Sequence, residues 1–356
     1  MELTESKVRA LALGGAVLGG GGGGALSEGL EIAKLAIALG TPRLVKLDDL
    51  QPKDVVITVA AVGAPAAKEA YVRPVDYVQA VELLLDLLDE PVAGLITNEM
   101  GGADSVNGLL QSALLGLPVV DAPCNGRAHP ISLMGAMGLH RMKGYRSIQA
   151  ACGGDPARGR RVELVVLGDL DCCSRLVREA SVQAGGVVAV ARNPVRADYL
   201  SQNAAVGAMR DAIALGELIL GGAPGDDVET QVARELGGEV VVRGRVSAVE
   251  LATVGGFDVG QVWIEDEYEL VFWNEYMLLE RARKRLFTFP DLIATFDADS
   301  HLPVTSAEIC EGMEVVVVAT YKENLKLGAG MRDPDLFTRI EEAVARPIVS
   351  YAFGKG

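Results

Sequence analysis

The chain has 356 residues, which is more than one compact core usually holds, so we expect two domains. Its net charge of −15 at pH 7 argues against a nucleic-acid partner, which would require a basic surface. Apolar residues make up 49% of the chain, but the longest apolar runs have the length of strands, so we expect neither wholesale disorder nor a membrane partner.

Strand-like and helix-like segments alternate over residues 1–235. The strand-like segments are short apolar runs at 55–62, 92–97, 118–120, 145–151, 162–167 and 186–191. The helix-like segments, with apolar residues three or four positions apart, lie at 30–39, 75–88, 105–115, 174–183 and 199–220. This alternation predicts an α/β domain over 1–235, in which helices flank a mostly parallel sheet.

The pattern changes near residue 239. Short segments of alternating character follow one another, beginning with EVVVRGRVSAVEL, and turn residues separate them. One helix-like segment follows at 335–345. We therefore expect a smaller β-rich domain over 236–356 with a short C-terminal helix.

The residues that follow the predicted strands are candidates for a binding site, because ligands of open parallel sheets bind at the carboxyl ends of the strands. Loops at 98–104, 121–130 and 152–155 combine glycines with polar or nucleophilic side chains. The glycine run Gly19–Gly24 follows the first apolar segment, and we expect it to be a fourth such loop. In a WNE motif further along, Asn274 is expected to reach the domain interface. We predict the substrate-binding residues Gly21, Gly22, Asn98, Gly101, Gly102, Asp104, Arg127, Cys152, Gly153 and Asn274.

The loop at 121–130 contains the candidate nucleophile, Cys124. A reactive cysteine needs a lowered pKa, which a cation, an imidazole or a helix N-terminus can supply. Arg127 and His129 lie close in sequence, and a proline after them predicts that a helix begins there. His129 is then a candidate base, and Arg127 would clamp a substrate carboxylate or brace Asp121. Alternatively, Cys124 is a small buried thiol and His129 caps the loop.

Glu99 and Asp121 each follow a predicted strand, so we predict that one or both orient or move protons in catalysis. In the alternative hypothesis, Glu99, Asp121 and His129 together bind a divalent metal ion that activates water. The five cysteines are odd in number and form no Cys-x-x-Cys pair, which predicts reduced thiols, a cytoplasmic protein and no structural zinc site. No cofactor is predicted, with the divalent metal ion as the alternative.

Three interpretations of the glycine run compete. A flexible linker does not fit, because periodic segments lie on both sides of it. A phosphate cradle is possible where glycines precede a helix, but six consecutive glycines match a dinucleotide-binding pattern trivially. In the third interpretation, bare backbone allows close approach of a small substrate or of a neighbouring loop. We favour the approach of a small ring, opposite Cys124.

Several motifs resemble one family. They are the glycine run, the Gly-Gly-Ala-Asp-Ser stretch at 101–105, the LPVVDA…GRAHP loop at 117–130, the WNE strand, and the segment at 290–319. In this order they resemble the S-methyl-thiohydantoin desulfurase-like family, whose members have an N-terminal α/β part and a β-rich C-terminal part. The resemblance implies hydrolysis of an S-methylated thiohydantoin ring carbon, with release of methanethiol. The chain departs from the commoner pattern at Pro123 and His129, and it adds Cys124.

Three functions are therefore open. The first is a hydrolase of a small cyclic amide or amidine-like ring, in which Cys124 attacks the ring carbon. The second is a metal-assisted hydrolase of the same ring class. The third is a non-catalytic binding or accessory subunit of a hydantoinase-type complex, which the resemblance suggests. In each case we expect a small-molecule ligand and a homo-oligomer.

Overall fold

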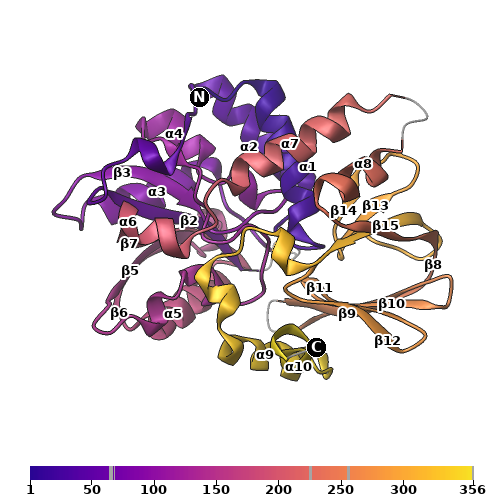
Figure 1. Cartoon of the computed structure of the whole chain (residues 1–356). Coiled ribbons are helices and arrows are strands. Elements are labelled where there is room, and N and C mark those ends of the chain that lie inside the picture. Colours follow the sequence, from indigo (N-terminus) through magenta and orange to yellow (C-terminus); the bar gives the residue numbers. More distant parts are fainter. Residues whose placement is uncertain (64–66, 68, 224–226, 255–256, 355–356) are drawn as a thin grey trace.

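The structure is a computed structural model that describes residues 1–63, 67, 69–223, 227–254 and 257–354. It consists of two β-sheets and the helices that cover them (Figure 1). The first sheet has the order β1-β4-β3-β2-β7-β5-β6. The pairs from β1 to β2 are parallel and those from β2 to β6 are antiparallel. The predicted α/β class is confirmed, with a mixed sheet formed by β1 (Leu44–Val45), β2 (Val55–Gly63), β3 (Val92–Thr97), β4 (Val119–Val120), β5 (Ser147–Gly153), β6 (Val162–Gly168) and β7 (Val187–Arg196).

Helices cover both faces of this sheet, which is why β2 and β3 consist almost entirely of buried apolar residues. On one face, Val81 and Leu84 of one helix pack in a cluster with residues of β5 and β7, and on the other Val177 of a second helix packs against β7. The α-helices described in this part are α1 (Glu5–Gly19), α2 (Leu26–Leu39), α3 (Pro74–Leu85), α4 (Leu109–Leu115), α5 (Leu170–Gln183), α6 (Ala197–Asn203), α7 (Ala208–Gly221) and α8 (Val228–Glu235).

Helix α1 corrects one prediction. The first apolar segment is a helix and not a strand, so the glycine run follows the end of a helix. Most residues of α1 are buried on every side, because the helix lies between α7 and the strands of the second sheet. Contact with α7 is very close: a Cβ atom on Gly14 would lie 1.8 Å from the carbonyl oxygen of Ala212.

Two predicted helices also differ from the structure. Beyond Pro130 the chain forms short 3-10 turns, at Met134–Ala136 and Leu139–Arg141, where we expected a helix. Met137 and Gly138 have φ values of 51° and 79°, which interrupt helical geometry. The segment predicted as one helix over 199–220 is divided into α6 and α7 by a turn.

The second sheet is wholly antiparallel, as expected for the β-rich part, and its order is β12-β11-β10-β9-β8-β15-β13-β14. Two helices, α9 (Pro334–Val344) and α10 (Val349–Phe353), follow it. Its strands are β8 (Glu239–Val254), β9 (Phe257–Ile264), β10 (Tyr268–Trp273), β11 (Glu275–Arg281), β12 (Lys284–Thr288), β13 (Leu292–Asp297), β14 (Pro303–Val304) and β15 (Glu314–Thr320).

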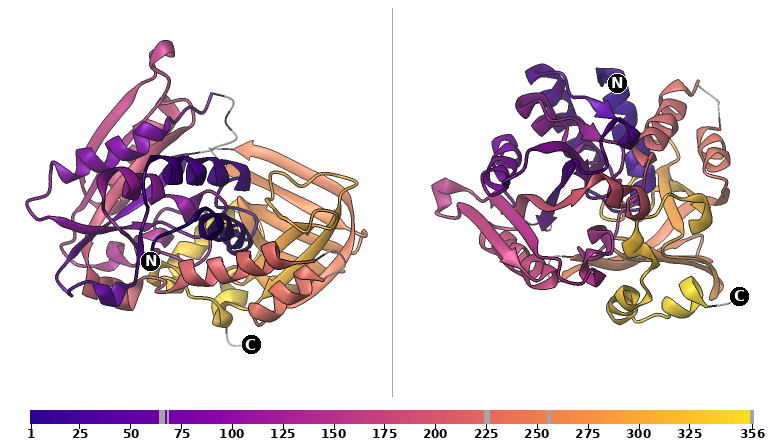
Figure 2. Two further views of the ribbon diagram at one scale, coloured as in Figure 1. Left: turned by 90° about the horizontal axis from the view of Figure 1, so that it is seen from above. Right: turned by 60° about the vertical axis from the view of Figure 1, so that its left-hand side comes forward.

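One hydrophobic core joins the two sheets. It contains Ile96 and Val120 of the first sheet, Leu278 of the second, and Phe289 and Phe337, whose rings lie 5.4 Å apart. Seen from above, the two sheets lie on opposite sides of α1 and α2 (Figure 2). The boundary at residue 235 stays a prediction. None of the helices described here combines the length and apolarity that crossing a membrane requires.

Candidate functional site

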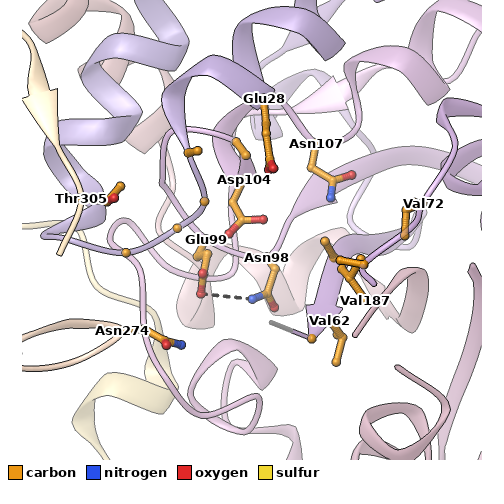
Figure 3. Close-up of a pocket in the computed structure, with 18 of the residues that line it drawn as sticks. Glu28, Val62, Val72, Asn98, Glu99, Asp104, Asn107, Val187, Asn274 and Thr305 are labelled. Atoms are coloured by element: carbon orange, nitrogen blue, oxygen red, sulfur yellow. Dashed lines mark hydrogen bonds between the residues drawn. The ribbon is translucent and has the colours of Figure 1, made fainter. Parts of the chain in front are cut away.

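A cavity of about 740 Å³ lies between the first sheet and the second (Figure 3). This volume is in the range of sites for small organic ligands. Its walls come from the ends of β2 and β3, the start of α2, the turn between β10 and β11, and residues 305–308. Of the predicted residues, the cavity is lined by Gly21, Gly22, Asn98, Glu99, Asp104, His129 and Asn274.

The glycine run forms one wall of this cavity, and we call Gly19–Gly24 the glycine loop. Gly23 has a φ of 78°, and its carbonyl accepts hydrogen bonds of 3.1 Å from the amides of Ala103 and Asp104. A Cβ atom on Gly23 would lie 2.5 Å from the Cα atom of Gly101. Gly101 and Gly102 therefore support the loop from behind and do not line the cavity. Bare backbone is needed here so that two loops can touch.

Glu99 lies at the centre of the polar wall. Its Oε2 atom is 3.0 Å from Nε2 of His129 and accepts hydrogen bonds of 3.3 Å from Nδ2 of Asn98 and the amide of His129. Burial raises the pKa of Glu99, but the charge of His129 and the hydrogen bonds from His129 and Asp104 outweigh burial and leave the pKa lowered. Glu99 is therefore held as a carboxylate.

Two further acids of the same cavity are shifted in the opposite direction. Burial raises the pKa of Asp104 well above its usual range, and the charge of Glu99 raises it further. The pKa of Glu275 is also raised well above its usual range, by burial and then by the charge of Glu99. Among the described residues, Oε2 of Glu275 is buried without a hydrogen-bond partner. Neighbouring carboxyl groups with pKa values pushed apart are a common arrangement of acid and base in active sites.

Asn274 lies in the wall of the cavity. It has a φ of 57° in the turn between β10 and β11, a conformation that asparagine tolerates. Its Oδ1 atom accepts a hydrogen bond of 2.9 Å from the amide of Asp258. Asn274 thus shapes the turn that carries Glu275 to the cavity.

The structure does not place Cys124 in the cavity wall. The thiol is fully buried in the core between the sheets, with Sγ 3.3 Å from Oγ1 of Thr58. Burial raises the pKa of Cys124 to about 11, against the opposing effects of Thr58 and Arg192. No α-helix begins after the loop to lower it. The alternative prediction, a small buried thiol, describes this geometry.

Asp121 and Arg127 also lie outside the cavity wall. Asp121 accepts hydrogen bonds from the amide of Met209 and from Nη1 of Arg210, at 2.9 and 2.7 Å. Arg127 is fully buried, and its Nη1 donates a hydrogen bond of 3.0 Å to the carbonyl of Pro290, in the turn between β12 and β13. These two side chains hold segments of the fold together. Arg127 lies behind the glycine loop, since a Cβ atom on Gly20 would be 2.8 Å from its Nη2, and it does not line the cavity.

Cys152 and Gly153 end β5 inside the protein and do not line the cavity. Cys152 packs in the apolar core under α3, and burial raises its pKa to about 12. The predicted metal set is also separated, because Asp121 is engaged elsewhere while Glu99 and His129 face the cavity. Within the described ranges, no three His, Cys, Asp or Glu side chains gather as a metal site would require.

Sequence reasoning missed several residues of the site. Glu275 belongs to the WNE motif, but the alternation of residues along a strand does not predict the positive φ of Asn274. That φ forms the turn that carries Glu275 to the cavity. Arg192 lies within the mostly apolar strand β7, so nothing in the sequence indicates that its side chain reaches a cavity. The missed polar residues that line the cavity include Glu28, Tyr77, Asn107, Arg178, Arg192, Glu275 and Ser306.

Comparison with known proteins supports one family. A model of the S-Me-THD-like N-terminal domain matches residues 6–155, and a model of the S-Me-THD-like C-terminal domain matches residues 169–327. A crystal structure of a protein from Chromobacterium violaceum has a similar fold, with a TM-score of 0.74 and 22% identity, over 96% of this chain and 97% of that chain. None of the curated proteins compared matches the chain. Because the two family models cover most of the sequence, the chain belongs to the S-methyl-thiohydantoin desulfurase-like (S-Me-THD-like) family, as its motifs predicted.

Proposed function

We propose that the protein hydrolyses the exocyclic C–S bond of a small S-methylated thiohydantoin-like ring and releases methanethiol. One observation carries this proposal: a cavity of small-molecule size contains two carboxyl groups whose pKa values are shifted apart, lowered for Glu99 and raised well above the usual range for Glu275. Family membership supports a thiohydantoin-related role, and the two carboxyl groups supply the base and the acid that hydrolysis needs.

In the proposed reaction, Glu99 removes a proton from water as the water oxygen bonds to the ring carbon. Glu275 donates its proton to the ring nitrogen of the C=N bond, which gives a tetrahedral intermediate. The C–S bond then breaks as the hydroxyl proton passes to the Glu275 carboxylate and the carbonyl forms. Methanethiolate takes the proton that Glu99 holds, so both carboxyl groups return to their starting states. Both water protons end on the ring nitrogen and on sulfur, so no redox partner is needed.

The neighbouring residues hold these groups in their roles. The carboxyl group of Asp104 donates a hydrogen bond to Glu99, which helps to keep Glu99 ionised in a buried place. His129 orients the Glu99 carboxylate through the 3.0 Å contact of Nε2. The amides of Gly23 and Gly24 face no hydrogen-bond partner in the described chain, and in this proposal they contact the ring carbonyl oxygen.

The direct test is methanethiol release from an S-methylated thiohydantoin by the purified protein, measured by headspace gas chromatography. We expect stoichiometric release with formation of the hydantoin, and the same rate after treatment with a chelator. Loss of turnover on chelation, restored by a divalent metal, would favour the metal-assisted alternative. Binding of the ring without turnover would favour an accessory subunit.

The pH profile should carry the signature of the two carboxyl groups. The pKa of Glu99 is lowered, so kcat/KM is expected to fall at low pH, below the ordinary carboxyl range, as Glu99 becomes protonated. The pKa of Glu275 is raised well above that range, so kcat/KM falls again at higher pH as Glu275 loses its proton. In Glu275→Gln, the remaining activity should lose the fall at high pH. An unchanged profile in this variant would assign the acid to another group.

The glycine loop predicts separate effects of two neighbouring substitutions. Gly22→Ala would place a Cβ atom 2.1 Å from Oε1 of Glu275, so we expect kcat to fall by about 10²-fold as the carboxyl moves, with a small change in melting temperature. Gly21 has a φ of 93° and its Cβ would lie 2.8 Å from the ring of Tyr276, so Gly21→Ala should chiefly destabilise the fold. Gly221→Ala, with open space around it, is the control. Full activity in Gly22→Ala would show that Glu275 is not needed at its observed position.

A further inference from the structure

Two guanidinium groups line the same cavity as the acids. Arg178 extends from α5, and Arg192 from β7, the strand between β2 and β5. Val177, the residue before Arg178, packs with Val188 and Val190 of β7, so these segments of α5 and β7 lie against each other. The charge of Arg192 lowers the pKa of Arg178, as expected for two cations in one neighbourhood.

Arg178 lacks a counterion in the described part of the chain. It forms no ion pair and no side-chain hydrogen bond there, and its recorded contact is with the face of the Phe257 ring, 4.9 Å from the centroid. Burial is the larger cause of its lowered pKa, and no acidic residue contributes a compensating effect. A partly buried arginine without an anion is costly unless something else supplies the charge.

Arg192 is more deeply buried, with 3% of its surface exposed. Its Nη2 atom donates a hydrogen bond of 2.7 Å to Oδ1 of Asn98, a neutral partner. Its Nε atom is buried and has no partner among the described residues. Guanidinium donors normally meet carboxylate or phosphate oxygens in pairs, so this group has unused donors that a ligand can satisfy.

Two acids that line the cavity, Glu99 and Asp258, have hydrogen-bond partners other than the two arginines. Glu99 accepts hydrogen bonds from His129 and Asn98. Asp258 follows Phe257 but accepts a hydrogen bond of 2.7 Å from Oγ1 of Thr253. The cavity therefore has acids beside the glycine loop, and two arginines that form no ion pair with the described residues, although the charges of Glu99 and Asp104 act on Arg192.

We propose that Arg178 and Arg192 form a carboxylate subsite, and that the physiological ligand is a small ring with a carboxylate-bearing substituent. This inference rests on the proposed function for the identity of the ring. The ring occupies the acidic wall, beside Glu99, and the substituent extends along the apolar wall. Val62, Val72 and Val187 lie together on that wall (Figure 3) and can pack against methylene groups.

The test measures binding and not turnover, with two ring probes of matched size. Hydantoin-5-acetate and hydantoin-5-acetamide are titrated by calorimetry into the wild-type protein, Arg178→Gln and Arg175→Gln. Arg175 is the matched control, because it lies one turn away on α5, exposed, outside the cavity and paired with Asp171. We expect the wild type to bind the acetate more tightly than the acetamide.

In Arg178→Gln the Kd of the acetate should rise about 10- to 100-fold, which is the value of one charge-assisted hydrogen-bond pair. The Kd of the acetamide should not change, and Arg175→Gln should behave as the wild type. Equal affinity of the wild type for both probes, or an equal loss of both in Arg178→Gln, would overturn the subsite. A preference for the acetate without any methanethiol release would keep the subsite and reject the proposed reaction. Methanethiol release without a preference for the acetate would support the proposed reaction and reject the subsite.

Discussion

Replacement of Glu99 by glutamine is expected to lower kcat for methanethiol release by about 10²- to 10⁴-fold, the usual contribution of a general base. Glutamine has nearly the same shape, and its amide oxygen can still accept the hydrogen bonds from Asn98 and His129. It cannot accept a proton from water. The measurement is headspace thiol release under saturating substrate, with the Kd of hydantoin and the melting temperature recorded for the same variant. Both of these are expected to change little.

Cys124→Ala is the informative control for this experiment. Because the thiol is buried outside the cavity wall, the variant should retain the turnover of the wild type and lose some stability through the small void it leaves. If Glu99→Gln were fully active and Cys124→Ala were inactive but folded, the attacking group would be the thiol. The assignment of water as the nucleophile would then be wrong.

Gly14→Val is expected to have the largest effect on stability, a loss of about 3 kcal/mol in the free energy of unfolding from overpacking. The Cβ atom alone would lie 1.8 Å from the carbonyl oxygen of Ala212, and this neighbour is backbone that cannot rotate away. Helices α1 and α7 would have to separate, and α1 also packs on the second sheet. The measurement is the urea midpoint followed by circular dichroism.

Gly221→Val provides the comparison, because Gly221 ends the same helix α7 with no atom within 4 Å of its Cβ position. This variant should unfold close to the wild-type midpoint. Equal midpoints for the valine variants of Gly14 and Gly221 would mean that the contact between α1 and α7 adjusts without cost. The tight approach of these helices would then be unimportant for stability.

The sequence allowed most of the strands to be predicted, since short apolar runs bounded by turn residues have few alternatives. The segment predicted at 92–97 coincides with β3. Helix α1 was not recognised because it is buried on several sides, so its sequence lacks the one-sided periodicity that identifies surface helices. The prediction that the glycine loop follows a strand is consequently wrong, because the loop follows α1. The loop does line a cavity of small-molecule size.

The chemistry of the site was predicted less completely, for a physical reason. Glu99 and His129 follow strand ends and do face the cavity, while Cys124 and Arg127, in the same loop as His129, are buried in the core. Sequence proximity gives no information about which side of an irregular loop a residue occupies. Glu275 reaches the cavity from the second sheet, and no local pattern links it to Glu99.

The strand order of the first sheet determines whether the chain can be cut into two fragments that fold separately. The family models separate between residues 155 and 169, yet β7 lies beyond that point and is inserted between β2 and β5. A fragment ending near 155 would lack β6 and β7, so one edge of β2 and both edges of β5 would be unpaired, and it would lack Glu275 and Arg192. We therefore expect that the two parts do not fold as independent domains. If they were encoded by separate genes, activity would require one polypeptide to complete the other's sheet by inserting a strand.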